Sequence, residues 1–202
     1  WMKRDVAWVI ERYLTCRRVK AGHQRPHGKL QPLEVPQWKW EQISMDFITK
    51  LTRTACGVDA IQVIVDRLTK SAHFLAINES SSTERLAEIY VREVEARHGV
   101  STPIVSDRDG CFTSRFWKKF HEKLGTRLHF STAYHPQTNQ QSEWTIQTLE
   151  DMLHACVMDF GGSWDTYFPL AEISYNNNYH SSIGMPPSKL LYGRNFRTPS
   201  FF

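Results

Sequence analysis

Residues 43–77 have the hydrophobic pattern of β-strands, and the residues that follow have hydrophobic side chains at helical spacing. Three consecutive stretches, at residues 43–51, 60–65 and 72–77, are rich in β-branched and aromatic residues and predict three successive strands. Apolar residues then recur at helical spacing at Leu86, Ile89, Tyr90 and Val94. Ser81, followed three residues later by Glu84, predicts a capping box at the start of this helix, and Gly99 is expected to end it.

The second half of the chain alternates between the two patterns. Residues 103–107 and 127–131 predict short strands, with a helix from Thr113 or Ser114 to about 124 between them. A longer helix is expected over residues 142–160, closed by Gly161 and Gly162. The tail from 163 is expected to be mostly helical, with interruptions at Pro169 and at residues 186–187. This order, βββαβαβαα, predicts an α/β fold in which helices cover one mixed sheet.

The first 36 residues differ from the rest in composition. Residues 2–20 have helical spacing, and residues 21–36 are rich in Gly and Pro among basic side chains, which is typical of a linker. Residues 1–40 hold nine Lys or Arg and three Asp or Glu, a net charge of +6, whereas residues 41–202 hold 16 and 18, a net charge of −2. We therefore place a boundary near residue 36, with a basic arm before it and a slightly acidic core domain at 37–202.

Composition excludes two classes of protein. No stretch approaches the roughly 18 apolar residues of a membrane span, so no membrane association is expected. The four cysteines are scattered without a C-x-x-C pair, and no signal peptide precedes them, which indicates a reducing intracellular setting.

Three acidic residues are the candidate chemistry of the core. Asp46 lies within the first predicted strand, where a carboxylate is unfavourable unless the strand is an edge strand with one wet face. Asp107 ends a predicted strand, where aspartate is also common in turns, and Glu143 begins a helix, where the dipole favours a carboxylate. Together, however, a strand centre, a strand end and a helix start can bring three carboxylates to one rim of a sheet. Such a cluster binds divalent cations, and a two-metal site catalyses phosphoryl transfer.

Asp107 and Glu143 are separated by 35 residues. The sequence motifs around the three acids and in the tail are WEQISMDF at 40–47, IVSDRD at 104–109, TAYHPQT at 132–138, QSE at 141–143, YNN at 175–177, YHSSIGMPP at 179–187 and LYGR at 191–194. The spacing resembles the D,D-35-E signature, and the motifs resemble those of gypsy-type long-terminal-repeat retrotransposon integrases, within the retroviral integrase superfamily. The resemblance covers essentially the whole chain.

This resemblance implies a ribonuclease H-like fold, with a mixed five-stranded sheet flanked by helices and a short N-terminal helical arm. It implies two reactions on DNA, 3′-end processing and strand transfer, at a two-metal site of Mg²⁺ or Mn²⁺. Asp46, Asp107 and Glu143 would be both the catalytic residues and the metal ligands. Asp109 is the alternative to Asp107, but its separation from Glu143 is 33 residues and it falls outside the predicted strand.

The resemblance also implies partners and a place of action. These are DNA (the element's ends and the target), other copies of the chain in a homo-oligomer, and the nucleus. The loop before Glu143 is expected to border the DNA end. The candidate nucleic-acid contacts are Tyr134, His135, Gln137, Gln141, Lys118, Lys119, Arg67 and Lys70; for each, an ordinary solvated side chain is the alternative.

The sequence departs from the family in its first segment and near the acids. Residues 1–36 resemble the last third of a His-His-Cys-Cys zinc module followed by a linker. Tyr13 stands where the earlier cysteine is expected, so Cys16 remains alone, and His23 and His27 fall in the linker. Zinc is therefore not expected. Asn139-Gln140, Gly110-Cys111 and Trp144 also differ from the family pattern. These departures favour a catalytically silent nucleic-acid-binding or interaction module as the alternative to a polynucleotidyl transferase. A ribonuclease H-type hydrolase is a third alternative, which shares the fold but lacks support from the flanking motifs.

Overall fold

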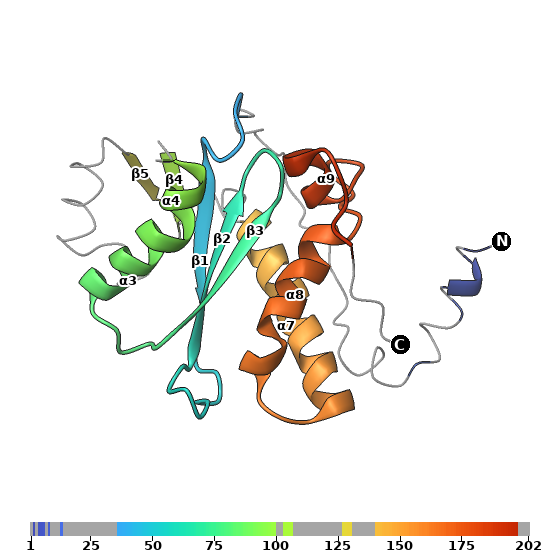
Figure 1. Cartoon of the computed structure of the whole chain (residues 1–202), viewed down its shortest axis with the longest axis horizontal. Coiled ribbons are helices and arrows are strands. Elements are labelled where there is room, and N and C mark those ends of the chain that lie inside the picture. Colours follow the sequence, from blue (N-terminus) through green and yellow to red (C-terminus); the bar gives the residue numbers. More distant parts are fainter. Residues whose placement is uncertain are drawn as a thin grey trace.

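The computed structural model describes the chain at Met2, residues 4–6, Trp8, Tyr13, and residues 36–99, 103–106, 127–130 and 140–197. The elements, shown in Figure 1, are β1 (Ile43–Ile48), β2 (Ala60–Asp66), β3 (Ala72–Ile77), α3 (Thr83–Tyr90), the π-helical segment η1 (Val91–Glu95), α4 (Ala96–His98), β4 (Pro103–Ser106), β5 (Arg127–Phe130), α7 (Gln140–Phe160), α8 (Trp164–Asn177) and α9 (Pro187–Tyr192). In this part of the chain no helix is long and apolar enough to cross a membrane.

The described strands form a sheet in the order β3-β2-β1-β4-β5. β1, β2 and β3 pair antiparallel, as expected of three strands joined by short turns. β4 lies parallel to β1, and β5 lies parallel to β4. The prediction of an α/β fold is therefore confirmed.

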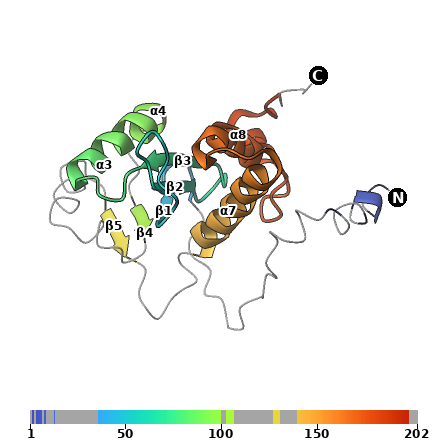
Figure 2. The ribbon, with the colours of Figure 1, turned by 90° about the horizontal axis from the view of Figure 1, so that it is seen from below.

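Helices cover both faces of the sheet, with α3 and α4 on one side and α7 and α8 on the other (Figure 2). The alternation of side chains along β1 supplies both cores. Met45 packs against the α3 layer, where Tyr90 and Val94 are fully buried. Ile48 packs in the other core, together with Leu149 of α7 and residues of α8. Each fully buried side chain of this kind stabilises the fold by about 1.5–3 kcal/mol.

Helix α8 closes the open edge of the sheet at β3. Asn176 accepts a hydrogen bond from the Ala72 N–H at 2.9 Å and donates one to the Ala72 carbonyl at 2.8 Å. One turn earlier, Glu172 Oε2 accepts from the Phe74 N–H at 2.8 Å. Because an uncovered edge strand is a template for pairing with another chain, these two side chains protect β3 as well as anchoring α8.

A cluster of rings joins the two helical layers around the same edge. His73 on β3 and His98 at the end of α4 meet through their Nε2 atoms at 2.9 Å. The Nδ1 of His73 lies 3.1 Å from Glu172 Oε1, and the Trp40 indole stacks on the His98 ring with 4.0 Å between centroids. Because a carboxylate can only accept, the Nδ1–H of His73 donates to Glu172, and with His73 neutral its Nε2 accepts the Nε2–H of His98. Burial, His73 and Arg97 lower the pKa of His98 to about 4.

Several predicted details of the helices are wrong. The helix after β3 is capped by Ser82, whose hydroxyl accepts from the Arg85 N–H, and not by Ser81. Three Ser and one Thr stand in a row there, and the backbone conformation decides which of them caps. Pro169 lies within α8 without interrupting it, because the residue is solvent-exposed and water can replace the single lost backbone bond.

The remaining helix predictions concern residues 2–20, residues 113–124 and the glycines expected to end helices. Met2, residues 4–6 and Trp8 are helical, but Tyr13 is not, so the helix predicted over 2–20 does not continue through Tyr13. The helix predicted at 113–124 lies outside the described residues. Gly99 ends α4 at a φ of 85°, and Gly161 follows α7 at 69°, as predicted.

We expect His98 to make the fold sensitive to acid. Between about pH 6.5 and about pH 4 the unfolded chain binds a proton at His98 that the folded chain does not, so the free energy of unfolding decreases as the pH falls through this window. Urea unfolding at about pH 7 and about pH 4.5 measures the decrease. His98→Gln keeps a donor for His73 without titrating, and should reduce it. An equal decrease in the wild type and the variant would contradict this assignment.

Candidate active site

Asp46 is placed by the central strand of the sheet. β1 lies between β2 and β4, so the alternative of an edge strand with a wet face is wrong. Ile43 and Met45 face the α3 layer and Ile48 faces the α7 and α8 layer, so alternation puts Asp46 on the α7 side. The side chain is half-buried, and its Oδ1 accepts a hydrogen bond from the Phe47 N–H at 2.8 Å.

The parallel pairing of β1 and β4 brings the second candidate region to the first. Cα partners along this ladder are Ile43 with Ile104, Ser44 with Val105 and Met45 with Ser106. Met45 and Ser106 are the residues that directly precede Asp46 and Asp107 in the chain. Asp107 itself lies outside the described residues.

Glu143 belongs to the start of helix α7, which begins at Gln140. The backbone of Glu143 is helical, as predicted, and its side chain lies outside the described part. Helix α7 packs against β1 and β2, so its axis is fixed relative to the strand that carries Asp46. Thr145 and Leu149 anchor it there, at 2% and 0% exposure.

One buried hydrogen bond ties the first turns of α7 to α8. Thr145 Oγ1 lies 3.0 Å from the hydroxyl of Tyr175, and Tyr175 packs edge-on against Phe74 of β3. Burial raises the pKa of Tyr175, and the hydrogen bond with Thr145 opposes that shift. The bond lies two residues from Glu143, so it limits rotation of α7 at the point that determines where Glu143 is presented.

The candidate DNA contacts fall into two groups. Arg67 and Lys70 lie in the turn between β2 and β3, where Arg67 Nη1 donates to the side-chain carbonyl of Gln42 and Lys70 Nζ donates to the Arg67 carbonyl at 2.7 Å. Burial lowers the pKa of both, and Arg67 also lowers that of Lys70. The other candidates lie outside the described residues or, for Gln141, have only a described helical backbone: Tyr134, His135, Gln137, Gln141, Lys118, Lys119 and the alternative acid Asp109.

The side chains that hold this region together were not predicted from the sequence. Thr145, Tyr175 and Gln42 form its polar contacts, yet none is distinguished by charge. The YNN motif at 175–177 has a structural role. Tyr175 hydrogen-bonds to Thr145 of α7, and Asn176 hydrogen-bonds to the backbone of Ala72 on β3. Asn177 accepts a hydrogen bond from the Phe196 N–H.

A divalent cation suits the donor types that were predicted, because carboxylate oxygens are the ligands that Mg²⁺ prefers. Within the described ranges, no group of three or more His, Cys, Asp or Glu could hold a metal ion. Two of the three predicted ligands have no described side chain. Of the candidate metal site, the structure therefore describes the half-buried carboxylate of Asp46 and the register between β1 and β4.

Comparison with known proteins places this fold. No protein-family model matches the chain. The Tf2-3 and Tf2-4 transposon polyproteins of Schizosaccharomyces pombe are 34% identical over 191 residues, which is 95% of this chain. The chain spans about 14% of the length of each polyprotein.

Solved integrase structures share the architecture. A chain of the simian T-cell lymphotropic virus intasome in complex with PP2A regulatory subunit B56 gamma matches with a TM-score of 0.66 and 17% identity, over 98% of this chain and 70% of that one. The catalytic core domain of BIV integrase matches with a TM-score of 0.58 and 20% identity, over 75% and 93%. The HTLV-2 integrase catalytic core domain in complex with magnesium (trimeric form) matches at 0.61 and 12%, over 76% and 97%. The fold is therefore an α/β fold similar to integrase catalytic cores.

We expect Tyr175→Phe to loosen the start of α7. Removing the hydroxyl deprives buried Thr145 Oγ1 of this partner, at a cost of about 1 kcal/mol in the free energy of unfolding. Amide hydrogen exchange in the first two turns of α7 should become faster. Thr145→Val should act similarly, and the double variant should cost less than the sum of the two.

The matched control is Tyr167→Phe, because Tyr167 also lies on α8 but donates to the Gly161 carbonyl beyond the far end of α7. Exchange at the start of α7 should be unchanged in this control. Unchanged exchange in Tyr175→Phe as well would show that the Thr145 bond does not hold the helix.

Proposed function

We propose that this chain, which is 34% identical to a stretch of the Tf2 transposon polyproteins and shares the fold of integrase catalytic cores, is an integrase of the gypsy-type long-terminal-repeat retrotransposons and catalyses metal-dependent polynucleotidyl transfer during DNA integration. In the first reaction, water cleaves a phosphodiester near the 3′ end of the element's DNA. In the second, the new 3′-hydroxyl attacks a phosphodiester of the target. Both are in-line displacements, so the protein's task is to position groups and stabilise charge.

The register of β1 and β4 carries this proposal. Met45 pairs with Ser106, and each is followed by an aspartate. Neighbouring strands lie about 4.8 Å apart, and paired residues of a parallel ladder face the same side of the sheet. If the ladder extends by one residue, Asp107 faces the α7 side next to Asp46. Asp109, two residues further on, would lie beyond the pair, which favours Asp107 as the second acid.

Glu143 completes the proposed site from the helix above. Helix α7 packs on β1 and β2, on the face to which Asp46 belongs, and Glu143 lies in its first turns. Three carboxylates close together repel one another, and divalent cations relieve this repulsion. When bound, Mg²⁺ or Mn²⁺ would stabilise charge on the entering and leaving oxygens. Asp46, Asp107 and Glu143 would hold it, and Thr145 with Tyr175 would fix the helix that presents Glu143.

The remaining parts of the proposal follow the family. The sheet would be the five-stranded mixed sheet of the ribonuclease H-like class, in a core domain at 37–202, and residues 1–36 would be a helical arm and linker left from a zinc module. DNA would be contacted by Tyr134, His135, Gln137, Gln141, Lys118, Lys119, Arg67 and Lys70. The chain would act as a homo-oligomer in the nucleus.

We expect strand transfer to depend on the three acids. With Mn²⁺ and a pre-trimmed duplex end, the wild-type protein should join the end to target DNA. Asp46→Asn, Asp107→Asn and Glu143→Gln should each lower the rate by at least about 100-fold, because each removes a charged metal ligand. Glu143→Gln should leave the melting temperature unchanged or raise it, because it relieves repulsion.

Asp109→Asn is the matched control, since it removes the same charge two residues from Asp107 and should retain activity. If Asp109→Asn abolishes transfer while Asp107→Asn does not, the assignment of the second acid is wrong. If the wild type binds DNA but yields no transfer product with Mn²⁺ or Mg²⁺, the chain is instead a silent DNA-binding module.

A further inference from the structure

The last segment of the chain has an unusual charge composition. After Glu172 the sequence contains no Asp or Glu, whereas it contains Lys189, Arg194 and Arg197. All three cations are solvent-exposed, on α9 and in the segment that follows it. Within the described ranges none of them forms an ion pair with a carboxylate. Their charge therefore faces solvent without compensation in that part of the structure.

Three further cations adjoin this segment from other parts of the sequence. Lys39 Nζ donates to the Leu191 carbonyl on α9 at 2.7 Å. Arg67 and Lys70 lie in the β2–β3 turn, which is next to α9 at the same end of the molecule (Figure 1). His180, between α8 and α9, is close enough to Lys70 for that charge to lower its pKa, in addition to burial. We call Lys39, Arg67, Lys70, Lys189, Arg194 and Arg197 the cationic end surface.

Among the described residues, two carboxylates by this surface accept hydrogen bonds from their own turns, and one of them, Asp66, also raises the pKa of Lys70 through its charge. Asp66 is fully buried, and its Oδ2 accepts from the backbone N–H and the hydroxyl of Thr69. Glu41 Oε2 accepts from the N–H groups of Gln37 and Trp38, both at 3.0 Å. Both acids therefore shape turns, while Lys189, Arg194 and Arg197 are solvent-exposed.

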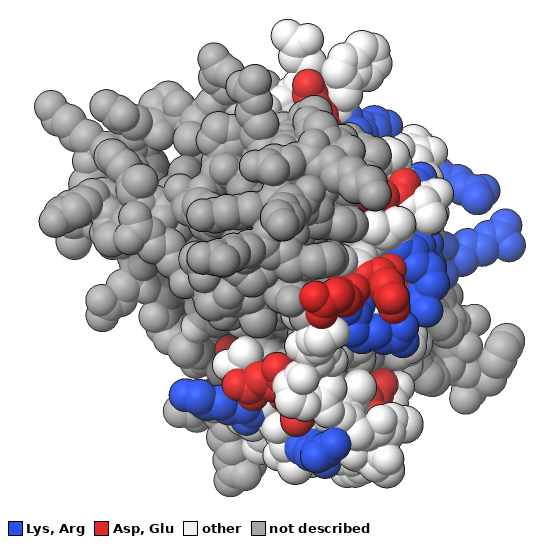
Figure 3. All heavy atoms as spheres, turned by 90° about the vertical axis from the view of Figure 1, so that its left-hand side faces the viewer, with Lys and Arg blue, Asp and Glu red and all other residues white. Residues whose placement is uncertain are grey.

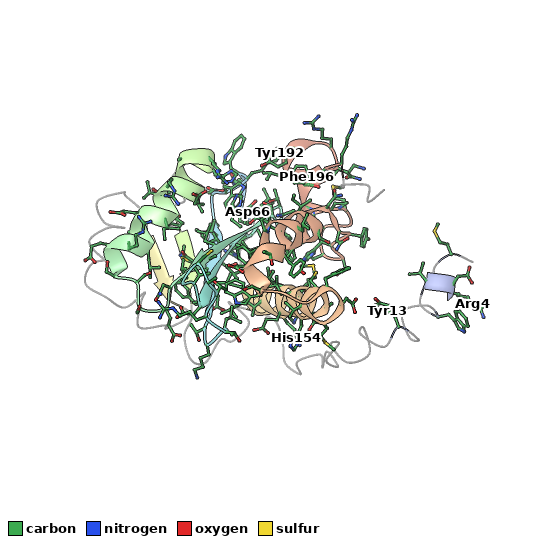
Figure 4. The ribbon with its side chains drawn as sticks, turned by 60° about the horizontal axis from the view of Figure 1, so that its bottom comes forward. Arg4, Tyr13, Asp66, His154, Tyr192 and Phe196 are labelled. Atoms are coloured by element: carbon green, nitrogen blue, oxygen red, sulfur yellow. The ribbon has the colours of Figure 1, made fainter. Side chains whose placement is uncertain are left out.

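Aromatic side chains are exposed among the cations. Trp38 is 74% exposed and Tyr192 is 55% exposed. Figure 4 shows Tyr192 and Phe196 together beyond the sheet, at the end where Asp66 lies, and their ring centroids are 5.5 Å apart. Lys and Arg gathered on one face are the electrostatic footprint of a nucleic-acid-binding surface, and the exposed rings lie within this footprint.

We propose that the cationic end surface binds the sugar-phosphate backbone of duplex DNA, as a contact separate from the acidic site. The proposal rests on the proposed function, which supplies the DNA. Asp66 lies at the start of the turn that carries Arg67 and Lys70, and it pairs with Ile43 of β1. Ile43 precedes Asp46 by three residues, so these two residues are about 10 Å apart along the strand. About three base pairs span this distance, so a stiff duplex that runs along β1 with a phosphodiester at Asp46 would also reach the cationic end surface.

The structure supplies a matched control on another face. Arg85 is paired with Glu88 at 3.0 Å, and Glu93 lies between Arg92 and Arg97 at 2.8 and 2.7 Å. Basic and acidic side chains lie side by side on this side of the molecule (Figure 3). Three arginines can therefore be removed from α3, η1 and α4 with the same change in net charge, but from a face where carboxylates already compensate them.

Fluorescence anisotropy with a labelled duplex of about 30 base pairs, in EDTA and over a range of salt concentrations, tests the proposal. The triple variant Lys189→Ala, Arg194→Ala, Arg197→Ala should weaken binding at least about tenfold and flatten the slope of log K against log salt by about 2 to 3. The triple variant Arg85→Ala, Arg92→Ala, Arg97→Ala should change both by much less. Arg194→Glu alone should weaken binding in the same direction, and melting temperatures verify that each variant is folded.

Equal weakening by the two triple variants would overturn the proposal, because net charge alone would then explain it. Unchanged binding by the first triple variant, or a loss confined to single-stranded DNA or RNA, would overturn it as well. The assay contains no metal, so its result is independent of catalysis. If the wild type performs strand transfer but the first triple variant binds duplex DNA normally, only the proposal of the cationic end surface is refuted. If the wild type performs no transfer but the first triple variant loses binding as expected, only the proposed enzymatic activity is refuted.

Discussion

The packing of both cores and the position of Asp46 follow from the register of β1 with its neighbours β2 and β4. β1 is the central strand, and its antiparallel neighbour β2 is buried along its whole length. A one-residue slip in the register of β1 would move Met45 and Ile48 to the wrong cores, so packing on both faces fixes the register. The same register sets Met45 opposite Ser106, and so determines which acids can meet at the rim. The stability of the sheet and the geometry of the proposed site are therefore one property.

Helix α8 is bonded both to the sheet and to α7. It protects the β3 edge through Glu172 and Asn176, and it holds α7 through Tyr175 and Thr145. The helix that carries Glu143 is thus packed on the sheet that carries Asp46 and bonded to a helix that is itself fixed to the same sheet. Such support favours chemistry that depends on positioning, because small displacements of a ligand are costly.

The sequence predicted the parts of this structure that depend on local pattern. The strands at β1–β3, the long helix α7 and the glycine stops follow from periodicity and backbone conformation. The capping residue Ser82 and the continuity of α8 through Pro169 could not be predicted, because both depend on backbone geometry that neighbouring residues share. For the site, spacing and flanking words identified Asp46, Asp107 and Glu143 as candidates. The bond between Thr145 and Tyr175 was beyond sequence reasoning, since it joins uncharged residues 30 positions apart.

In the proposed site, Asp46 and Asp107 share a divalent cation on the α7 side of the sheet. Diffraction from crystals soaked in Mn²⁺, recorded at the manganese edge, locates such an ion. We expect an anomalous peak at about 2.0–2.2 Å from a carboxylate oxygen of each aspartate, with Glu143 on the same side. A structure in which the two carboxylates are too far apart to share an ion, or in which the peak lies at Asp109, would contradict it.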